Sequence, residues 1–500
     1  MRTPRAVAIV LLLGLLISAC GSRLNDQTRQ QAAAAYLRTG SGAGPASSGG
    51  LDNQAGGQLP GAVSNNGGPV TNTNTGTNTG AGAVGPGNTG STKTGTTKSG
   101  GTAPQQQQQA GTSCPTSGTD TGLTSNQVSF GTIASTTGPV AGLFEGAIQG
   151  EQAFRAFANS TGGICGHAVN VVAADDGTNC NQNQNATQNM ASRIFAFVGS
   201  FSLYDGCGAA YIKQHNIPDL HVQLDPRAGE PASHYDVEPG PLGYTTGPFA
   251  YYAKKYPSAV KAVGTLFPNI PSAVQKQHAF VKAANSVGWK FVYSRAADAT
   301  ETDWTSDFVK MCGQQHIKIF FTSAENAQNA AKMIQNESQA GCPKSLINII
   351  PIAYDQAFVA DVGDTSKIEG MMGWNEFSLF FNKDEAQRIP ELQQLQTWFQ
   401  RVNGNKPLNL YALFAWAEGR LFQQAFENAG PTINRKTLLA ALAKIHKFDA
   451  NGIVAPVDPG SKTEGVNCYL LWNFSHGAFH RMDSPATGYR CDGKFMPLNG

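Results

Sequence analysis

The chain has 500 residues, of which 57 are glycine and only 14% are charged, and its formal net charge at neutral pH is +2. This balance leaves no strongly basic surface for nucleic acid, so we expect no nucleic-acid partner. The glycines crowd towards the N-terminal end, so the sequence predicts a low-complexity part followed by a part that can bury a core.

The first twenty residues have the pattern of an export signal. Arg2 and Arg5 give a positively charged start, and the apolar run over 7–17 is shorter than the roughly 20 residues of a membrane span. Small residues precede Cys20, as in a bacterial lipobox. We therefore expect a lipoprotein signal peptide over 1–20, a lipid on Cys20, and a mature chain held outside the cytoplasm on a membrane. An ordinary cleaved signal is the alternative.

Residues 21–126 have too few apolar side chains to form a core. Gly, Ser, Thr, Asn and Gln dominate this stretch, which includes the glutamine run 105–109. Such a composition does not bury enough apolar area to offset the entropy lost on ordering. We expect a disordered tether that ends at residue 126.

Strand-like and helix-like patterns alternate from residue 128 onward. The first series predicts strands at 128–133, 169–174, 194–198 and 221–224, with helices at 145–159, 182–192 and 205–215. A second series predicts strands at 260–267, 290–293, 317–322 and 346–352, with helices at 272–287, 304–314 and 324–340. Because parallel strands need crossover helices, this alternation indicates α/β architecture with two parallel sheets.

The C-terminal part follows a different pattern. Helical periodicity predicts helices at 390–401, 410–429 and 435–445. Alternating residues around 468–472 and 478–482 predict an antiparallel hairpin that bends at Ser475, His476 and Gly477.

The cysteines indicate disulfides rather than a metal site. Nine cysteines less Cys20 leave an even number, and none forms a CxxC pair. Eight cysteines allow 105 connectivities. From spacing, we expect the pairs Cys165–Cys180, Cys312–Cys342, Cys468–Cys491 and Cys114–Cys207.

Several segments resemble a known family. They are Phe130–Ala141, Asn159–Gly166 with the strand that ends at Asp175 and Asp176, Glu301–Trp304, the helix over 411–429, and 438–448 leading into Asn451 and Gly452. In this order they resemble type I periplasmic binding proteins of the branched-chain amino acid and amide group, the relatives of leucine-binding protein. The resemblance spans about 128–482.

This resemblance implies two α/β lobes, each with a doubly wound parallel sheet, joined by a hinge of three crossovers. The expected crossovers lie near Leu242, Trp374 to Glu376, and Phe448. Lobe 1 would then comprise residues 127–242 and 376–447, and lobe 2 residues 243–375 and 448–500. A small-molecule ligand would lie in the cleft between the lobes, beyond the carboxyl ends of the strands.

On lobe 1 the resemblance points to the loop after the third strand. Family members present hydroxyls and helix N-terminal amides there to a carboxylate, so Ser202 and Tyr204 become ligand candidates and Asp205 the cap of the following helix. Gln223 stands where the family often has a small hydroxyl-bearing turn. That departure argues against an α-amino acid as the ligand.

On lobe 2 the candidates all follow predicted strands: Asn269, Ser323, Glu325, Tyr354 and Asp355. Asp355 is placed where the family receives an amino group. Glu325 could serve that role instead or cap the next helix, and Tyr354 could form an apolar wall.

We therefore expect an extracytoplasmic solute-binding protein that passes a small polar metabolite (an amino acid, an amide or a small organic acid) to an ABC importer. A lipid-anchored sensor of the same fold is the alternative. We expect a monomer without cofactor, metal or enzymatic activity, because no nucleophile elbow or phosphate loop appears. Asp175 and Asp176 belong to a strand end, and His476 and His480 have no evident third ligand.

Overall fold

The computed structural model describes residues 114–139, 141–323, 326–482 and 487–498. The predicted signal peptide, the lipid on Cys20 and most of the predicted tether lie outside these residues. Within the described ranges, no helix combines the length and the apolarity that crossing a membrane requires.

The first lobe contains a five-stranded parallel sheet with the order β2-β1-β3-β4-β5. Its strands are β1 (Gln127–Ala134), β2 (Ala168–Asp175), β3 (Ala196–Ser200), β4 (Asp219–His221) and β5 (His234–Tyr235). Its helices are α3 (Glu145–Ser160), α4 (Cys180–Ala191), α5 (Ala209–His215), α11 (Lys383–Arg388), α12 (Pro390–Asn403), α13 (Leu410–Glu427) and α14 (Arg435–Leu442).

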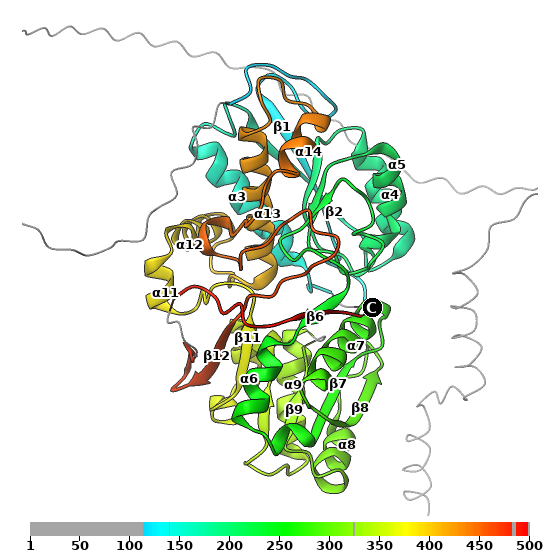
Figure 1. Cartoon of the computed structure of the whole chain (residues 1–500), viewed down its shortest axis with the longest axis vertical. Coiled ribbons are helices and arrows are strands. Elements are labelled where there is room, and N and C mark those ends of the chain that lie inside the picture. Colours follow the sequence, from blue (N-terminus) through cyan, green and yellow to red (C-terminus); the bar gives the residue numbers. More distant parts are fainter. Residues whose placement is uncertain (1–113, 140, 324–325, 483–486, 499–500) are drawn as a thin grey trace, which may run out of the picture. The chain divides into compact units, whose positions relative to one another are not determined.

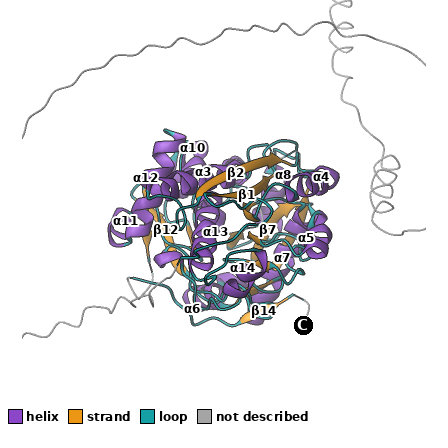
Figure 2. Ribbon diagram, turned by 90° about the horizontal axis from the view of Figure 1, so that it is seen from above, coloured by secondary structure: helices purple, strands orange, loops and turns teal. Residues whose placement is uncertain are grey.

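Both faces of this sheet are covered because side chains along each strand alternate between the faces. Phe130 packs against Phe154 of α3 and Phe422 of α13 on one face. On the other face, Ile133 and Phe197 belong to a separate apolar cluster with residues of α4 and α5. Figure 2 shows these helices arranged around the strands.

The second lobe contains a seven-stranded sheet with the order β13-β12-β11-β10-β9-β7-β8. Its strands are β7 (Val263–Pro268), β8 (Phe291–Ala297), β9 (Ile319–Phe321), β10 (Ile347–Ile349), β11 (Met372–Asn375), β12 (Leu470–Ser475) and β13 (Ala478–Arg481). Its helices are α6 (Gly247–Lys255), α7 (Pro271–Ser286), α8 (Thr305–Phe308), a π-helical continuation Val309–Gln314, α9 (Ala327–Gln339) and α10 (Gln356–Val362). Strands β7 to β11 pair in parallel, whereas β12 and β13 form the expected antiparallel hairpin.

The chain passes between the two sheets three times (Figure 1). It leaves the first lobe after β5 and returns to that lobe after β11. It then enters the second lobe again between α14 and β12. A short pair formed by β6 (Gly243–Thr245) and β14 (Phe495–Pro497) accompanies the first crossing. The expected fold, two parallel-sheet lobes with a three-crossover hinge, is confirmed.

The folded part begins earlier than the sequence predicted. Cys114 forms a disulfide with Cys165, and Leu123 is buried beside β1, where it pairs with Val128. Asp120 accepts a hydrogen bond from the backbone N–H of Arg435 at 2.9 Å. Residues 114–126 therefore belong to lobe 1 and not to a tether, because these few anchors compensate for their polar composition.

Four disulfides join the eight expected cysteines: Cys114–Cys165, Cys180–Cys207, Cys312–Cys342 and Cys468–Cys491. The last two pairs agree with the prediction, and the predicted pairs Cys165–Cys180 and Cys114–Cys207 are wrong. Cys180 opens α4, which packs beside the short turn that carries Cys207. Cys165 lies in the loop before β2, next to the segment that precedes β1. The cysteines of lobe 1 therefore pair according to which connecting segments lie side by side in the fold, and not according to their distance along the chain.

Candidate ligand-binding site

A cavity of about 250 Å³ lies between the two lobes. On lobe 1 it borders Phe201, directly after β3, and on lobe 2 it borders Pro268, at the end of β7, and Ser323, after β9. The strand order reverses at β1 in the first sheet, where β2 lies on one side and β3 on the other. It reverses at β7 in the second sheet, where β8 lies on one side and β9 on the other. Ligands of open α/β sheets bind at such switch points, beyond the carboxyl ends of the strands.

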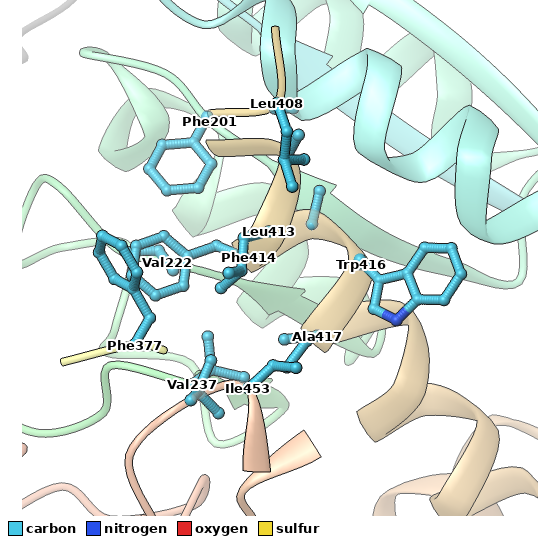
Figure 3. Close-up of a cluster of buried hydrophobic side chains, with 14 of the residues drawn as sticks. Phe201, Val222, Val237, Phe377, Leu408, Leu413, Phe414, Trp416, Ala417 and Ile453 are labelled. Carbon is cyan, nitrogen blue, oxygen red and sulfur yellow. The ribbon is translucent and has the colours of Figure 1, made fainter. Parts of the chain in front are cut away.

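Apolar side chains form most of the cavity wall. On the lobe 1 side these are Leu143, Phe144, Phe201, Leu203, Val222 and Phe414. Phe414 stacks on Phe201 with ring centroids 6.3 Å apart and meets Phe377 edge to face at 5.5 Å. Figure 3 shows Phe201, Phe377 and Phe414 with Val222 in a cluster of buried hydrophobic side chains. The wall is preformed, since rings packed on one another lose little further freedom when a ligand binds.

A group of polar side chains lies where the hinge crosses the cavity. The Tyr244 hydroxyl donates a hydrogen bond to the Glu376 carboxylate and accepts one from the Trp374 indole N–H at 2.7 Å. Burial and the Glu376 carboxylate raise the pKa of Tyr244 well above its usual value, so this hydroxyl keeps its proton. Glu376 is thereby fixed at the cavity wall.

Two further charged residues line the same region, Glu238 on the first crossing and Lys276 on α7. Burial raises the pKa of Glu238 to about 7, while the Lys276 ammonium opposes that rise. Burial also raises the pKa of Glu376, again against the effect of Lys276. This part of the cavity thus holds two carboxyl groups and one ammonium, and burial makes both carboxyl groups lose their protons less readily than in water.

Two of the predicted ligand residues, Gln223 and Ser323, line the cavity. The predicted strand at 221–224 is in fact β4, which ends at His221, so Gln223 lies in the loop beyond the strand. Its backbone N–H donates to Asp236 at 2.9 Å, and its side-chain amide donates to the carbonyl of Gly240. Gln223 therefore ties the end of β4 to the first crossing.

Ser202 and Tyr204 lie outside the cavity lining. The Ser202 hydroxyl is buried and donates to the Asp176 carboxylate, which also accepts from Asn183 at 3.0 Å. The N–H of Tyr204 donates back to Ser202 at 2.9 Å. Asp205 does not cap a helix as expected, because its carboxylate accepts instead from the N–H groups of residues 224 and 225. These polar groups organise lobe 1 itself.

Three predicted residues of lobe 2 also lie outside the lining. Asn269 is exposed, and its N–H donates to the carbonyl of Ala297 at 2.6 Å. The buried Tyr354 hydroxyl accepts from the N–H of Phe381 at 2.8 Å. Asp355 caps α10 by accepting from the N–H of Ala357 at 2.7 Å. Glu325 lies outside the described residues.

The comparisons with known proteins agree with this geometry. The sequence model of the periplasmic binding protein family matches residues 127–475. The chain belongs to the periplasmic binding protein family. This family is extracytoplasmic, which agrees with the predicted location of the folded part. No curated protein matches the sequence.

Solved periplasmic binding proteins share the fold at low sequence identity. A leucine-binding protein from Thermotoga maritima is 13% identical, with a TM-score of 0.58, over 71% of this chain and 98% of that one. A branched-chain amino acid ABC transporter protein from Thermus thermophilus with bound valine is 15% identical, with a TM-score of 0.61, over 74% and 97%. A fatty acid ABC transporter substrate-binding protein from Thermomonospora curvata is 15% identical, with a TM-score of 0.59, over 75% and 94%. These relatives are solute-binding proteins of transport systems.

Glu238, Tyr244, Lys276 and Glu376 are not among the ligand residues predicted from the sequence. Glu376 lies inside a predicted crossover between the lobes. Because crossovers border the cleft, its position there was a signal that could have identified it as a cavity residue. Lys276 lies in the second turn of α7, after the carboxyl end of β7, but nothing in its sequence neighbourhood distinguishes it from a surface lysine.

Proposed function

We propose that this periplasmic binding protein captures a small, largely apolar molecule with one amine or other hydrogen-bond donor and delivers it to an ABC permease. The observation that carries the proposal is the cavity between the lobes, with largely apolar walls and a charged group of Glu238, Lys276 and Glu376 where the hinge crosses it. Ligand contacts to both lobes would favour a closed arrangement, which a permease can distinguish from an open one. Anchoring through a lipid on Cys20 would hold the protein near that permease.

The composition of the cavity supports this ligand class over a small, fully polar metabolite. Burial of an apolar ligand body against Phe201, Phe377 and Phe414 contributes roughly 25 cal/mol per Å². An amine would meet the carboxyl groups of Glu238 and Glu376, whereas a carboxylate would face both of them and only Lys276 as a counter-charge. The related Thermus thermophilus protein holds valine, and a Rhodopseudomonas palustris relative holds 4-hydroxybenzoate. Both of these ligands have an apolar body.

A thermal-shift comparison of three probes on the full chain tests the proposal. Phenethylamine has an apolar body and an amine, phenylacetate has the same body with an acid, and glycinamide has an amine without the body. We expect the melting temperature to rise most with phenethylamine, because a ligand at a hundred times its Kd stabilises the folded state by about 2.7 kcal/mol. Glycinamide should give no rise.

Two variants show whether binding occurs in the cavity. Glu376→Gln should weaken the effect of phenethylamine by about tenfold in Kd, since it removes a buried charge partner. Glu230→Gln alters an exposed carboxylate that lies 3.7 Å from Lys213, and it should bind like the unmodified chain. A chain that responds to none of the probes, or only to glycinamide, would contradict the ligand class.

A further inference from the structure

Two adjacent strands of lobe 1 carry mirrored polar sequences. Strand β4 is Asp219-Leu220-His221, and β5 continues as His234-Tyr235-Asp236. The strands are parallel, with Asp219 opposite His234 and Leu220 opposite Tyr235. Because alternate residues of a strand share a face, Asp219 and His221 lie on the same face as His234 and Asp236. The register therefore builds a two-by-two array of carboxylates and imidazoles.

This array is buried and only partly hydrogen-bonded. Asp219, His221, His234 and Asp236 are each at most 3% exposed. The Nδ1 atom of His221 lies 2.8 Å from Asp219 Oδ1, which is a hydrogen bond. His234 Nδ1 lies 3.5 Å from Asp219 Oδ2, and His234 Nε2 lies 3.7 Å from Asp236 Oδ2.

Several atoms of the array have no hydrogen-bond partner among the described residues: both ring nitrogens of His234, Nε2 of His221 and Oδ2 of Asp219. A separation of 3.5 Å is too long for a good N–H···O hydrogen bond. Leaving buried polar atoms without partners costs about 1–3 kcal/mol each, so such a cluster requires a physical reason.

A metal ion accounts for the 3.5 Å separation between His234 Nδ1 and Asp219 Oδ2. Two ligand atoms bound to one tetrahedral zinc ion at about 2.0–2.1 Å lie roughly 3.3–3.5 Å apart. Asp219, His221 and His234 each offer one ligand atom, and these three atoms lie within 4.8 Å of one another. We propose that Asp219, His221 and His234 form a binding site for a divalent transition-metal ion of the zinc class.

The groups around the site would orient its ligands and balance the ion's charge. Asp205 approaches His221 Nε2 at 3.5 Å. Glu418 of α13 accepts from the N–H of Val237 with one oxygen, and its other oxygen is buried with no partner in the described chain. The Lys462 ammonium donates to the carbonyl of His234 at 2.8 Å. Carboxylates thus outnumber cations here, as a doubly charged ion requires.

Protons compete with the ion for the same atoms. Imidazole and carboxylate groups bind a metal ion in their deprotonated forms, so we expect binding to release protons and to weaken as the pH falls.

The site lies directly behind the lobe 1 wall of the cavity. Asp236 accepts from the N–H of Gln223 at 2.9 Å, and Asp205 accepts from the N–H of Leu224 at 2.6 Å. Both Gln223 and Leu224 line the cavity. A bound ion would therefore fix the carboxylates that hold this segment of the wall. The metal proposal does not depend on the identity of the captured ligand.

Metal content of the full chain provides the test. Because the site is enclosed, the chain is unfolded in guanidinium with its disulfides intact, refolded with Zn²⁺ or Co²⁺, and dialysed before elemental analysis. We expect about one ion per chain and a higher melting temperature than in the metal-free chain. The cobalt form should show the visible absorption of a tetrahedral nitrogen and oxygen site.

His234→Gln should lose the ion, whereas His446→Gln should keep it, because His446 is an exposed residue that pairs with Asp458 at 2.8 Å. If His234→Gln does not refold, the cobalt spectrum of the unmodified chain decides. A thiolate charge-transfer band would place the ion on cysteine and overturn the proposal. A refolded chain without metal, or a folded His234→Gln that retains it, would also overturn the proposal and leave a buried ion-pair network in its place.

Discussion

Polar residues that follow strands serve two purposes in this protein. Gln223 and Ser323 line the cavity, whereas Ser202 and Asp355 satisfy backbone and side-chain groups of their own lobes. All four occupy loops that the sequence marks equally well as ligand loops. What separates them is the direction of each side chain, which neighbouring elements fix after folding.

The structural role of Asp355, as a helix cap outside the cavity, can be tested by the pH dependence of stability. Burial raises its pKa to about 6, against the effect of its hydrogen bond from Ala357. Between pH 4 and pH 6 the folded chain therefore binds this proton more tightly than the unfolded chain, so Asp355 makes stability fall as the pH rises. Asp355→Asn removes the titration and keeps the cap. We expect the free energy of unfolding of Asp355→Asn, minus that of the unmodified chain, to rise by roughly 2 kcal/mol between pH 4 and pH 7.

Urea unfolding at several pH values measures this difference. Asp355→Ala is the matched variant, because it removes both the charge and the cap and should lose about 1 kcal/mol of helix stabilisation relative to Asn. A stability difference between Asp355→Asn and the unmodified chain that stays constant with pH would contradict the assigned role.

At the scale of elements, the core of lobe 1 depends on the close approach of α3 and α13. A Cβ atom at Gly150 would lie 2.3 Å from the carbonyl oxygen of Ala412, and one at Gly419 would lie 2.5 Å from the ring of Phe154. Glycine is therefore required here for packing rather than for a special backbone conformation. This close contact seats Phe130 between Phe154 and Phe422 and positions the start of α13 at the cavity.

Gly150→Ala should therefore destabilise the chain although alanine is the better helix former. We expect a loss of about 1–3 kcal/mol, because the added methyl group meets rigid backbone of α13. Gly313→Ala is the control, since Gly313 is exposed in a helical turn and a Cβ there has nothing within 4 Å. That variant should be neutral or slightly stabilised. Equal melting temperatures for the two variants would refute the packing argument.

For the whole molecule, the folded part already includes Cys114. The segment 114–126 contributes a disulfide, a buried Leu123 and the contact between Asp120 and Arg435. The sequence alone suggested a cut at residue 127, because the composition of this segment matches that of the residues before it.

Two truncations distinguish these boundaries. A fragment starting at residue 114 should melt like the full chain, whereas one starting at residue 127 should melt at a clearly lower temperature. The lost Cys114–Cys165 link spans 51 residues, and closing such a loop contributes about 4 kcal/mol in the chain-entropy estimate. Cys114→Ser with Cys165→Ser in the longer fragment separates the disulfide from the other contacts. Identical melting of the two fragments would show that residues 114–126 are dispensable.

Much of the fold could be predicted from local patterns. The strand over 128–133 and the helix over 145–159 lie within one residue of β1 and α3 at each end, because their apolar spacing is long and regular. The two-residue β5 and the short β14 were not predicted, because their pairing partners rather than their own residues define them. The missing β5 also concealed the array of Asp219, His221 and His234, whose members meet only through strand pairing.

The sequence by itself determined the α/β alternation, the two lobes, the family resemblance and the set of cysteines that form disulfides. These properties depend on residue type and on short-range periodicity, which are local. Only the tertiary structure decided the partners of Cys165 and Cys180, the side chains that face the cavity, and the meeting of Glu238, Lys276 and Glu376 where the hinge crosses it. Those outcomes depend on which crossovers become neighbours and on the direction of each side chain, and the packing of the whole chain settles both.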